Sequence, residues 1–206
     1  MNMFDYFLYF VVSYLFGSFP TAYLLIRIAS KKDIRNEGSG NVGTFNAIRV
    51  SRKKWIGAVV LLIDLLKGAL PAWYAGSISG KDDLIMLLVV CGVTLGHVYP
   101  VWLKFKGGRG LAVAAGALLM IEPVFVGIWL AIWLIFYIIL RIHTIASMIA
   151  TVALPVIVFF ARNIFFSDQC LLILLPVCML IFQRHLERLP DIVYEKSKQL
   201  MMENQR

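Results

Sequence analysis

The sequence predicts an all-α membrane protein: a polytopic transmembrane helical bundle of about seven helices, with the N-terminus outside and the C-terminus cytoplasmic. Composition is the first reason, because 60% of the 206 residues are hydrophobic and only 16% are charged, against about 25% charged in soluble domains. The apolar residues also form runs long enough to cross a bilayer. In addition, the basic residues gather in alternate connections between those runs. These features exclude a disordered chain and a disulfide-stapled domain.

The expected helices follow from the apolar runs and their breaks. A run of roughly 20 apolar residues spans the hydrocarbon core as a helix. Because proline ends or kinks a helix, the region 111–140 divides at Glu122-Pro123 into a short helix, a turn and a longer helix. The first run has Asp5 near its start and lacks the basic flank and cleavage site of a signal peptide. The expected segments are 4–28, 55–74, 84–103, 111–121, the remainder of 111–140, 144–160 and 170–182.

The basic residues determine the expected orientation. Seventeen of the 20 Lys and Arg residues fall in alternate connections and the tail, and only Lys81 and Arg162 fall in the other connections. Short loops rich in Lys and Arg stay in the cytoplasm, which puts the tail inside and requires an odd number of crossings. Seven crossings satisfy this, and five do if 111–140 does not cross twice. We expect a transmembrane domain, 1–184, and a cytoplasmic tail, 185–206, that forms a short amphipathic or frayed helix.

Two connections on the expected cytoplasmic side are rich in glycine and polar residues. In 37–49, glycines, hydroxyls and amides stand between basic flanks, and such backbone forms concavities that hold anions. In the second connection, Lys106-Gly-Gly-Arg-Gly110 directly precedes an expected helix, whose N-terminus offers free N–H groups. This loop lacks Walker A spacing, so ATP hydrolysis has no support. The pair suggests two phosphate groups, with a plain connector beside anionic lipid headgroups as the alternative for the first loop.

Few other residues suggest chemistry. Asp64 and Lys67 lie three apart on one face of an expected membrane helix, and we interpret them as a structural ion pair, with a proton relay as the alternative. His97 is either a general acid or base or a hydrogen-bonded structural residue. The three histidines are dispersed, so no metal or cofactor is expected. Membrane lipid, and not nucleic acid, is the expected partner of the basic surface.

Together these motifs resemble the PlsY family, the bacterial acyl-phosphate-dependent glycerol-3-phosphate acyltransferases. The resemblance covers roughly residues 10–185. It implies about seven helices, an outside N-terminus and a site that faces the cytoplasm. It rests on Gly17-Ser-Phe-Pro20, Gly38-Ser-Gly-Asn-Val-Gly43 with Asn46 and Arg49, Asp64-Leu-Leu-Lys-Gly68, Gly96-His-Val-Tyr-Pro100 and Phe105-Lys-Gly-Gly-Arg-Gly110.

The resemblance implies transfer of an acyl group from acyl phosphate to the 1-hydroxyl of glycerol 3-phosphate, giving lysophosphatidate and phosphate in the bacterial cell membrane. Because the donor is already activated, positioning two anions and stabilising the oxyanion suffice without a protein nucleophile. His97 and His185 are the candidate catalytic residues, and neither is assigned a definite role in the reaction. The residues implied to bind substrate or phosphate are Ser39, Gly40, Asn41, Gly43, Thr44, Asn46, Arg49, Lys104, Lys106, Gly107, Gly108 and Arg109.

The chain departs from the family pattern in three places. The usual Gly-Ala-Thr-Asn reads Gly43-Thr-Phe-Asn46, which removes a hydroxyl at position 45. Arg109 replaces a lysine, which keeps the charge and changes the geometry. In the third motif, usually His-Arg-Glu-Asn-Ile, Phe182 and His185 replace a histidine and an asparagine. The alternatives are therefore a catalytically weakened paralogue or a non-enzymatic phosphate- or lipid-binding membrane protein. A transporter is disfavoured because the polar loops lie on one side only.

Overall fold

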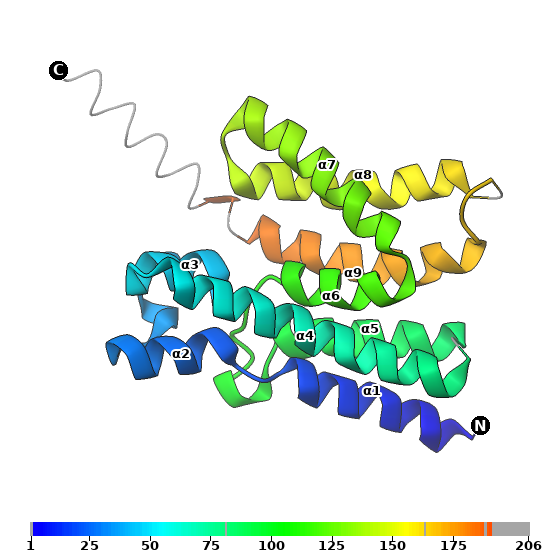
Figure 1. Cartoon of the computed structure of the whole chain (residues 1–206), viewed down its shortest axis with the longest axis horizontal. Helices are drawn as coiled ribbons and strands as arrows, with labels where there is room; N and C mark the ends of the chain where they lie inside the picture. The colour runs from blue at the N-terminus through cyan, green and yellow to red at the C-terminus, as the bar shows by residue number, and fades with distance from the viewer. Residues whose placement is uncertain (1, 81, 163, 188, 191–206) are drawn as a thin grey trace.

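The chain folds into helices that lie side by side in one elongated bundle (Figure 1). The computed structural model describes residues 2–80, 82–162, 164–187 and 189–190. In these ranges the regular structure is helical, apart from one isolated bridge between Arg162 and Phe166. The elements are α1 (Met3–Gly17), α2 (Thr21–Ser30), η1 (Ile34–Asn36), α3 (Thr44–Ser51), α4 (Lys54–Ser79), α5 (Asp83–Val98), η2 (Val101–Leu103), α6 (Leu111–Ile121), α7 (Pro123–Leu140), α8 (His143–Ala161) and α9 (Asp168–Leu186).

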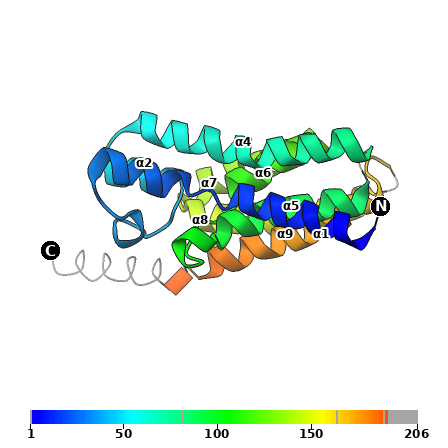
Figure 2. The same ribbon diagram turned by 90° about the horizontal axis from the view of Figure 1, so that it is seen from below.

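The long helices run alternately between two ends of the bundle (Figures 1 and 2). One end, the loop end, holds the segments 31–53, 99–110 and 141–142 together with the last turn of α9. The N-terminus and the connections α4–α5, α6–α7 and α8–α9 lie toward the opposite end. The two glycine-rich stretches therefore share one end of the molecule, away from the N-terminus.

The lengths and apolar character of the helices agree with the predicted transmembrane segments. Six helical segments are long and apolar enough to cross a membrane, and α6 is a shorter apolar helix of 11 residues. The predicted all-α membrane bundle is confirmed. The predicted short helix before Pro123 is also present as α6, and Pro123 itself lies in the first turn of α7. At 1.5 Å per residue α6 is about 16 Å long, so it covers only part of the hydrocarbon core. Which end faces the cytoplasm stays a prediction.

Three sequence-based boundaries are wrong. The helix expected over 84–103 ends at Val98, and Pro100 separates it from η2. The single helix expected over 4–28 is divided into α1 and α2, because Pro20 cannot donate a backbone hydrogen bond and stands directly before α2. The glycine-rich loop expected over 37–49 is helical in its second half, where α3 begins at Thr44 after the N-cap Gly43. In the expected tail, residues 185–186 belong to α9, and 191–206 lie outside the described residues.

Two buried apolar clusters hold the bundle together. The larger one draws on α4 to α9 and includes Val90, Val93 and Leu174. The smaller one lies at the loop end, where it packs residues of α2, η1, α3, α4 and η2 against one another. This smaller cluster includes Ile34 and Val42 on either side of the first glycine loop. The loop is thus fastened to the bundle at both of its ends.

Close helix contacts depend on glycine at several positions, of which two illustrate the effect. A Cβ at Gly96 of α5 would lie 2.1 Å from the carbonyl oxygen of Tyr14 in α1. A Cβ at Gly116 of α6 would lie 2.0 Å from the carbonyl oxygen of Leu65 in α4. Membrane helices associate through small residues because lipid provides no hydrophobic drive between them. These glycines bring α1 and α4 onto the helices that support the second loop.

We predict that Gly116→Ala destabilises the bundle by about 1–3 kcal/mol, because overpacking must push α4 and α6 apart. Thermal unfolding in detergent micelles measures the effect. The matched control is Gly127→Ala in α7, where a Cβ meets nothing within 4 Å. This control should unfold at the wild-type temperature or slightly above it. Equal melting temperatures for the two variants would contradict the packing described here.

Candidate active site

Asn46, in the first turn of α3, organises the first glycine loop from within. Its side chain is only 2% exposed. Its Oδ1 accepts a hydrogen bond from the backbone N–H of Ser39 at 2.9 Å. Its Nδ2 donates to the carbonyl oxygens of Ile34, Glu37 and Asn41 at 3.2, 3.0 and 3.0 Å. The amide of Asn46 therefore serves the loop backbone and shapes the loop from inside.

The loop winds around this amide through left-handed glycines. Gly38 and Gly40 have φ of 58° and 69°, which other residues adopt only at a cost. A Cβ at Gly38 would lie 2.3 Å from Asn46 Oδ1. The half-buried Asn41 packs its side chain over Gly43, with Nδ2 2.9 Å from where a Cβ would lie. The remaining predicted residues of this loop are the partly buried Ser39 and Thr44 and the exposed Arg49 of α3.

An ion pair that the sequence did not single out ties this loop to the second one. The Arg35 guanidinium binds the Asp33 carboxylate, with Nη2 to Oδ2 at 2.6 Å. These hydrogen bonds hold the pKa of Asp33 below its usual value. Arg35 Nη1 also donates to the carbonyl oxygen of Leu103 in η2 at 3.4 Å. The pair thereby connects η1 with the segment that leads into the second loop.

The second loop folds back onto the end of α5. The backbone N–H groups of Gly107 and Gly108 donate to the carbonyl oxygens of Val98 and His97, each at 3.1 Å. The last carbonyls of a helix lack intrahelical partners, so the loop caps α5. These two amides are thus used inside the protein. The loop also carries the exposed side chains of Lys104 and Lys106, and the N-terminus of α6, a kind of site that favours anions, follows it directly.

The two glycine loops touch each other. A Cβ at Gly108 would lie 2.8 Å from the carbonyl oxygen of Val42 in the first loop. In the second loop Lys104 and Lys106 are exposed, and Arg109 is partly buried. Arg109 Nη1 donates to Thr144 Oγ1 of α8 at 3.4 Å. Thr144 is a partner of a predicted site residue that sequence reasoning missed, because only the packing of α8 beside the loop brings it there.

Asp64, Lys67 and His97 form a buried polar cluster beneath the second loop. Lys67 Nζ lies 2.9 Å from Asp64 Oδ1 and donates to the carbonyl oxygen of Phe19 at 3.0 Å. His97 Nδ1 lies 3.9 Å from the same Asp64 oxygen. The three side chains are 2–8% exposed. On its other side, the His97 ring faces Gly108.

His185 near the end of α9 is completely buried. Its Nδ1 lies 2.7 Å from the carbonyl oxygen of Ile181. Because a carbonyl only accepts, Nδ1 carries the proton and Nε2 of the neutral ring has a lone pair. Within the described part of the chain, Nε2 has no hydrogen-bond partner. The half-buried Phe182 lies one turn before it in α9.

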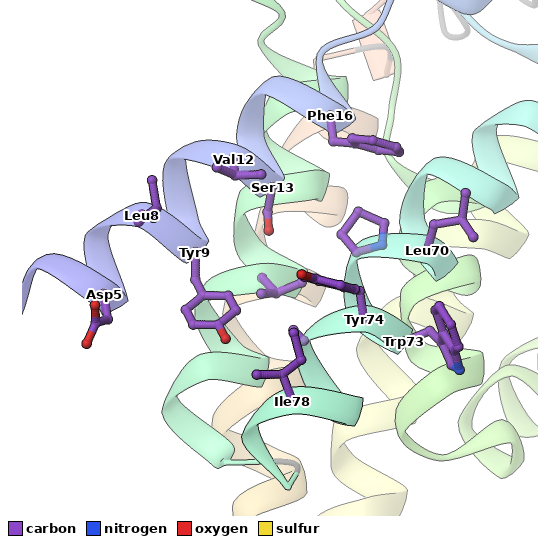
Figure 3. A pocket seen from close by; sticks show the side chains of 13 residues that line it. Asp5, Leu8, Tyr9, Val12, Ser13, Phe16, Leu70, Trp73, Tyr74 and Ile78 are labelled. Atoms are coloured by element: carbon purple, nitrogen blue, oxygen red, sulfur yellow. The ribbon is translucent and has the colours of Figure 1, made fainter. Parts of the chain in front are cut away.

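An apolar cavity lies elsewhere, between α1 and α4 (Figure 3). Its volume is about 680 Å³, and α1 contributes Tyr9 and Val12 while α4 contributes Tyr74 and Ile78. A neighbouring cavity of about 590 Å³ leads along the same two helices to Lys67. The lining is almost wholly apolar, so this space suits lipid chains. Of the predicted phosphate-binding residues, none lines either cavity.

Comparison with known proteins decides the family. Residues 7–194 match the family model described as glycerol-3-phosphate acyltransferase. The chain belongs to this family. Curated relatives with that name include one from Syntrophotalea carbinolica, 37% identical over 78% of this chain and 82% of its own length. Another, from Ehrlichia canis, is 32% identical over 92% of this chain and 96% of its own.

Solved structures agree with this membership. One is the glycerol 3-phosphate form of PlsY, an integral membrane glycerol 3-phosphate acyltransferase, with a TM-score of 0.81. The lysophosphatidic acid form of PlsY has a TM-score of 0.77. Both are 29% identical in sequence, and the match covers 93% of each chain. The glycerol-3-phosphate acyltransferase fold therefore extends over nearly the whole molecule, and this chain is a multi-pass membrane protein of that family.

We predict that Asn46→Asp disrupts the first loop of this acyltransferase as severely as Asn46→Ala. Asp keeps the acceptor for Ser39 but loses the donors to three carbonyls, and each buried group left unsatisfied costs about 1–3 kcal/mol. Hydrogen–deuterium exchange over 37–43 should speed up in both variants. The exposed Asn36 provides the control, because Asn36→Ala should leave this exchange unchanged. Wild-type exchange in Asn46→Asp would contradict the organising role.

Proposed function

We propose that the chain is a membrane acyltransferase that moves an acyl group from acyl phosphate to the 1-hydroxyl of glycerol 3-phosphate, giving lysophosphatidate and phosphate in bacterial phospholipid synthesis. The observation that carries the proposal is the contact between two glycine loops at one end of the bundle, in a chain whose first loop leads to Arg49 and whose second loop carries Lys104, Lys106 and Arg109. Family membership supports the same reaction. So do the bound forms of PlsY, whose names give the acceptor and the product.

The chemistry requires positioning more than reactive side chains. The acceptor hydroxyl oxygen attacks the acyl carbonyl carbon, the bond from that carbon to the phosphate oxygen breaks, and inorganic phosphate leaves with the bonding electrons. Holding both anions in line supplies most of the needed rate gain. In our proposal the first loop binds one phosphate through Ser39, Asn41, Thr44 and Arg49. The second loop binds the other through Lys104, Lys106 and Arg109, with charge-assisted hydrogen bonds to the developing anion.

A substrate phosphate accepts the hydroxyl proton in this proposal. A phosphate monoester has a second pKa near 6, so at neutral pH its dianion is a competent acceptor. In our proposal His185 acts instead as an acceptor: its Nε2 lone pair takes a hydrogen bond from the Arg109 guanidinium in the substrate complex, a role for which the family pattern has an amide side chain at this position. Its buried Nε2 lone pair, which is unpartnered within the described residues, supports this role.

We predict that His185→Asn keeps kcat within about 3-fold of wild type, whereas His185→Leu lowers it at least ~10-fold, since one lost hydrogen bond to a charged group is worth about 1.5–3 kcal/mol. Initial rates of phosphate release measure both variants. If His185 were a general base, both substitutions would lower kcat by about 10²–10⁴-fold, and that result would contradict the role proposed here.

We predict that the purified protein makes lysophosphatidate from acyl phosphate and not from acyl-CoA, whose acyl carbonyl carries a thioester sulfur in place of the phosphate leaving group that the second loop binds in our proposal. Asn41→Ala, Arg49→Ala and Lys106→Ala should each abolish this activity without unfolding the bundle. Lys53→Ala is the matched control, because it removes an exposed cation at the same end outside the loops. Inactivity of the folded wild-type protein would instead favour a phosphate-binding descendant of the enzyme, for which the changes at Phe182 and His185 are the motivating observation.

We further propose that the protein lies in the bacterial inner or plasma membrane with the loop end facing the cytoplasm. The excess of basic residues at that end supports this orientation. In a background without native cysteines, Lys53→Cys should resist a membrane-impermeant thiol reagent in intact spheroplasts, while Asp82→Cys should react. The reverse labelling pattern would overturn the orientation and would leave the reaction itself untouched.

A further inference from the structure

We propose that His97 is a positioning residue: Asp64 and Lys67 hold its imidazole from inside the bundle, and the ring in turn supports the loop that carries Lys106 and Arg109. This inference rests on the proposed function, because it concerns how the second loop binds a substrate phosphate. The supporting observations are the burial of the three side chains, the position of the ring and the hydrogen bonds of the loop.

The charged pair is buried where charge is costly. Asp64 is 2% exposed and Lys67 5% exposed within α4, a membrane-spanning helix. Burying a pair of charges often gains no stability over an apolar pair of similar size, so the pair needs another reason to be present. Lys67 also donates to the carbonyl oxygen of Phe19, at the break between α1 and α2. The pair, which belongs to α4, is thereby also tied to the connection between α1 and α2.

The His97 ring fills the space between this pair and the second loop. Its Nδ1 faces Asp64 Oδ1 at 3.9 Å, a distance that suits electrostatic orientation better than a direct hydrogen bond. Its Nε2 is so close to Gly108 that a Cβ there would lie 2.0 Å away. The carbonyl oxygen of His97 also accepts the N–H of Gly108. One residue therefore holds the loop by its ring and by its backbone.

The enclosure of the ring argues against a role as general base. His97 is 8% exposed, and both ring nitrogens face protein groups, Asp64 on one side and Gly108 on the other. An acceptor hydroxyl would have to displace the loop to reach Nε2. Loss of ring support should instead shift Lys106 and Arg109, which act on the bound phosphate. The expected effect is weaker substrate binding with little change in the rate of the bound complex.

Two substitutions at His97 separate the roles. Glutamine places its amide near the Nε2 position and still reaches Gly108, whereas asparagine ends near the Nδ1 position and leaves the loop unsupported; neither residue titrates. We predict that His97→Asn raises the KM for at least one phosphate substrate ~10-fold with kcat within ~3-fold, the pattern of lost binding. His97→Gln should restore KM to within ~3-fold and keep the pH profile of the wild type.

A double substitution in α4 tests whether the Asp64–Lys67 ion pair orients His97. Asp64→Asn with Lys67→Met removes both charges at nearly constant volume, which avoids leaving one buried charge alone. This double variant should fold, with thermal unfolding as the check, and should raise KM as His97→Asn does. Wild-type KM in the folded double variant would overturn the role of the pair.

The remaining outcomes also decide the matter. A fall in kcat of about 10²–10⁴-fold in both His97→Asn and His97→Gln, with an altered pH profile, would show a general base and overturn the proposal. Calorimetric titration of each variant with glycerol 3-phosphate and with inorganic phosphate reports loop position without turnover. If the wild-type protein binds these anions but shows no activity, the proposed function fails. The inference then stands or falls on whether His97→Asn weakens binding ~10-fold and His97→Gln does not.

Discussion

The two backbone hydrogen bonds from Gly107 and Gly108 to the end of α5 are the interaction on which the loop end depends. They satisfy carbonyls that a helix leaves unpaired, and they draw the second loop down onto the bundle. Only in that position does Gly108 meet both His97 and the carbonyl of Val42. The contact between the two phosphate-suited loops is therefore a consequence of how one membrane helix ends.

Other parts of the loop end follow the rule that buried polar groups are satisfied, although the buried Nε2 of His185 is an exception within the described residues. The side-chain amide of Asn46 is satisfied by hydrogen bonds with the backbone of the first loop. The charges of Asp33 and Arg35 satisfy each other, and Arg35 also joins η1 to η2 through a hydrogen bond to Leu103. Within the bundle, the buried ammonium group of Lys67 is satisfied by its ion pair with Asp64 and by its hydrogen bond to the carbonyl oxygen of Phe19. Such a scaffold leaves little freedom to the loops, as a reaction driven by positioning requires. The apolar cavity between α1 and α4 lies apart from this polar machinery.

The sequence predicted the features that depend on local composition. Apolar runs are long enough to identify membrane helices, and Pro123 marked the boundary between α6 and α7. Glycine spacing and charge indicated two anion-suited loops before any fold was known. The break at Pro20 was missed although Gly17, Ser18 and Thr21 surround it, because the apolar runs on both sides together read as one spanning stretch. Helix α3 was missed because glycine and asparagine dominate the loop that precedes it.

Contacts between distant segments were beyond sequence reasoning. Asn46 was expected to face a phosphate, yet its amide serves the loop, and nothing local distinguishes these two roles. Thr144 reaches Arg109 only because α8 packs beside the second loop. The contact between the His97 ring and Gly108 likewise depends on how the second loop folds back onto the end of α5.

Hydrogen–deuterium exchange of the purified protein with and without glycerol 3-phosphate tests the central claim most directly. If the two touching loops form one phosphate site, the ligand should slow exchange in both 37–49 and 104–111 and leave α7 unchanged. Protection confined to the helices around the α1–α4 cavity, or no protection in either loop at saturating ligand, would contradict the account.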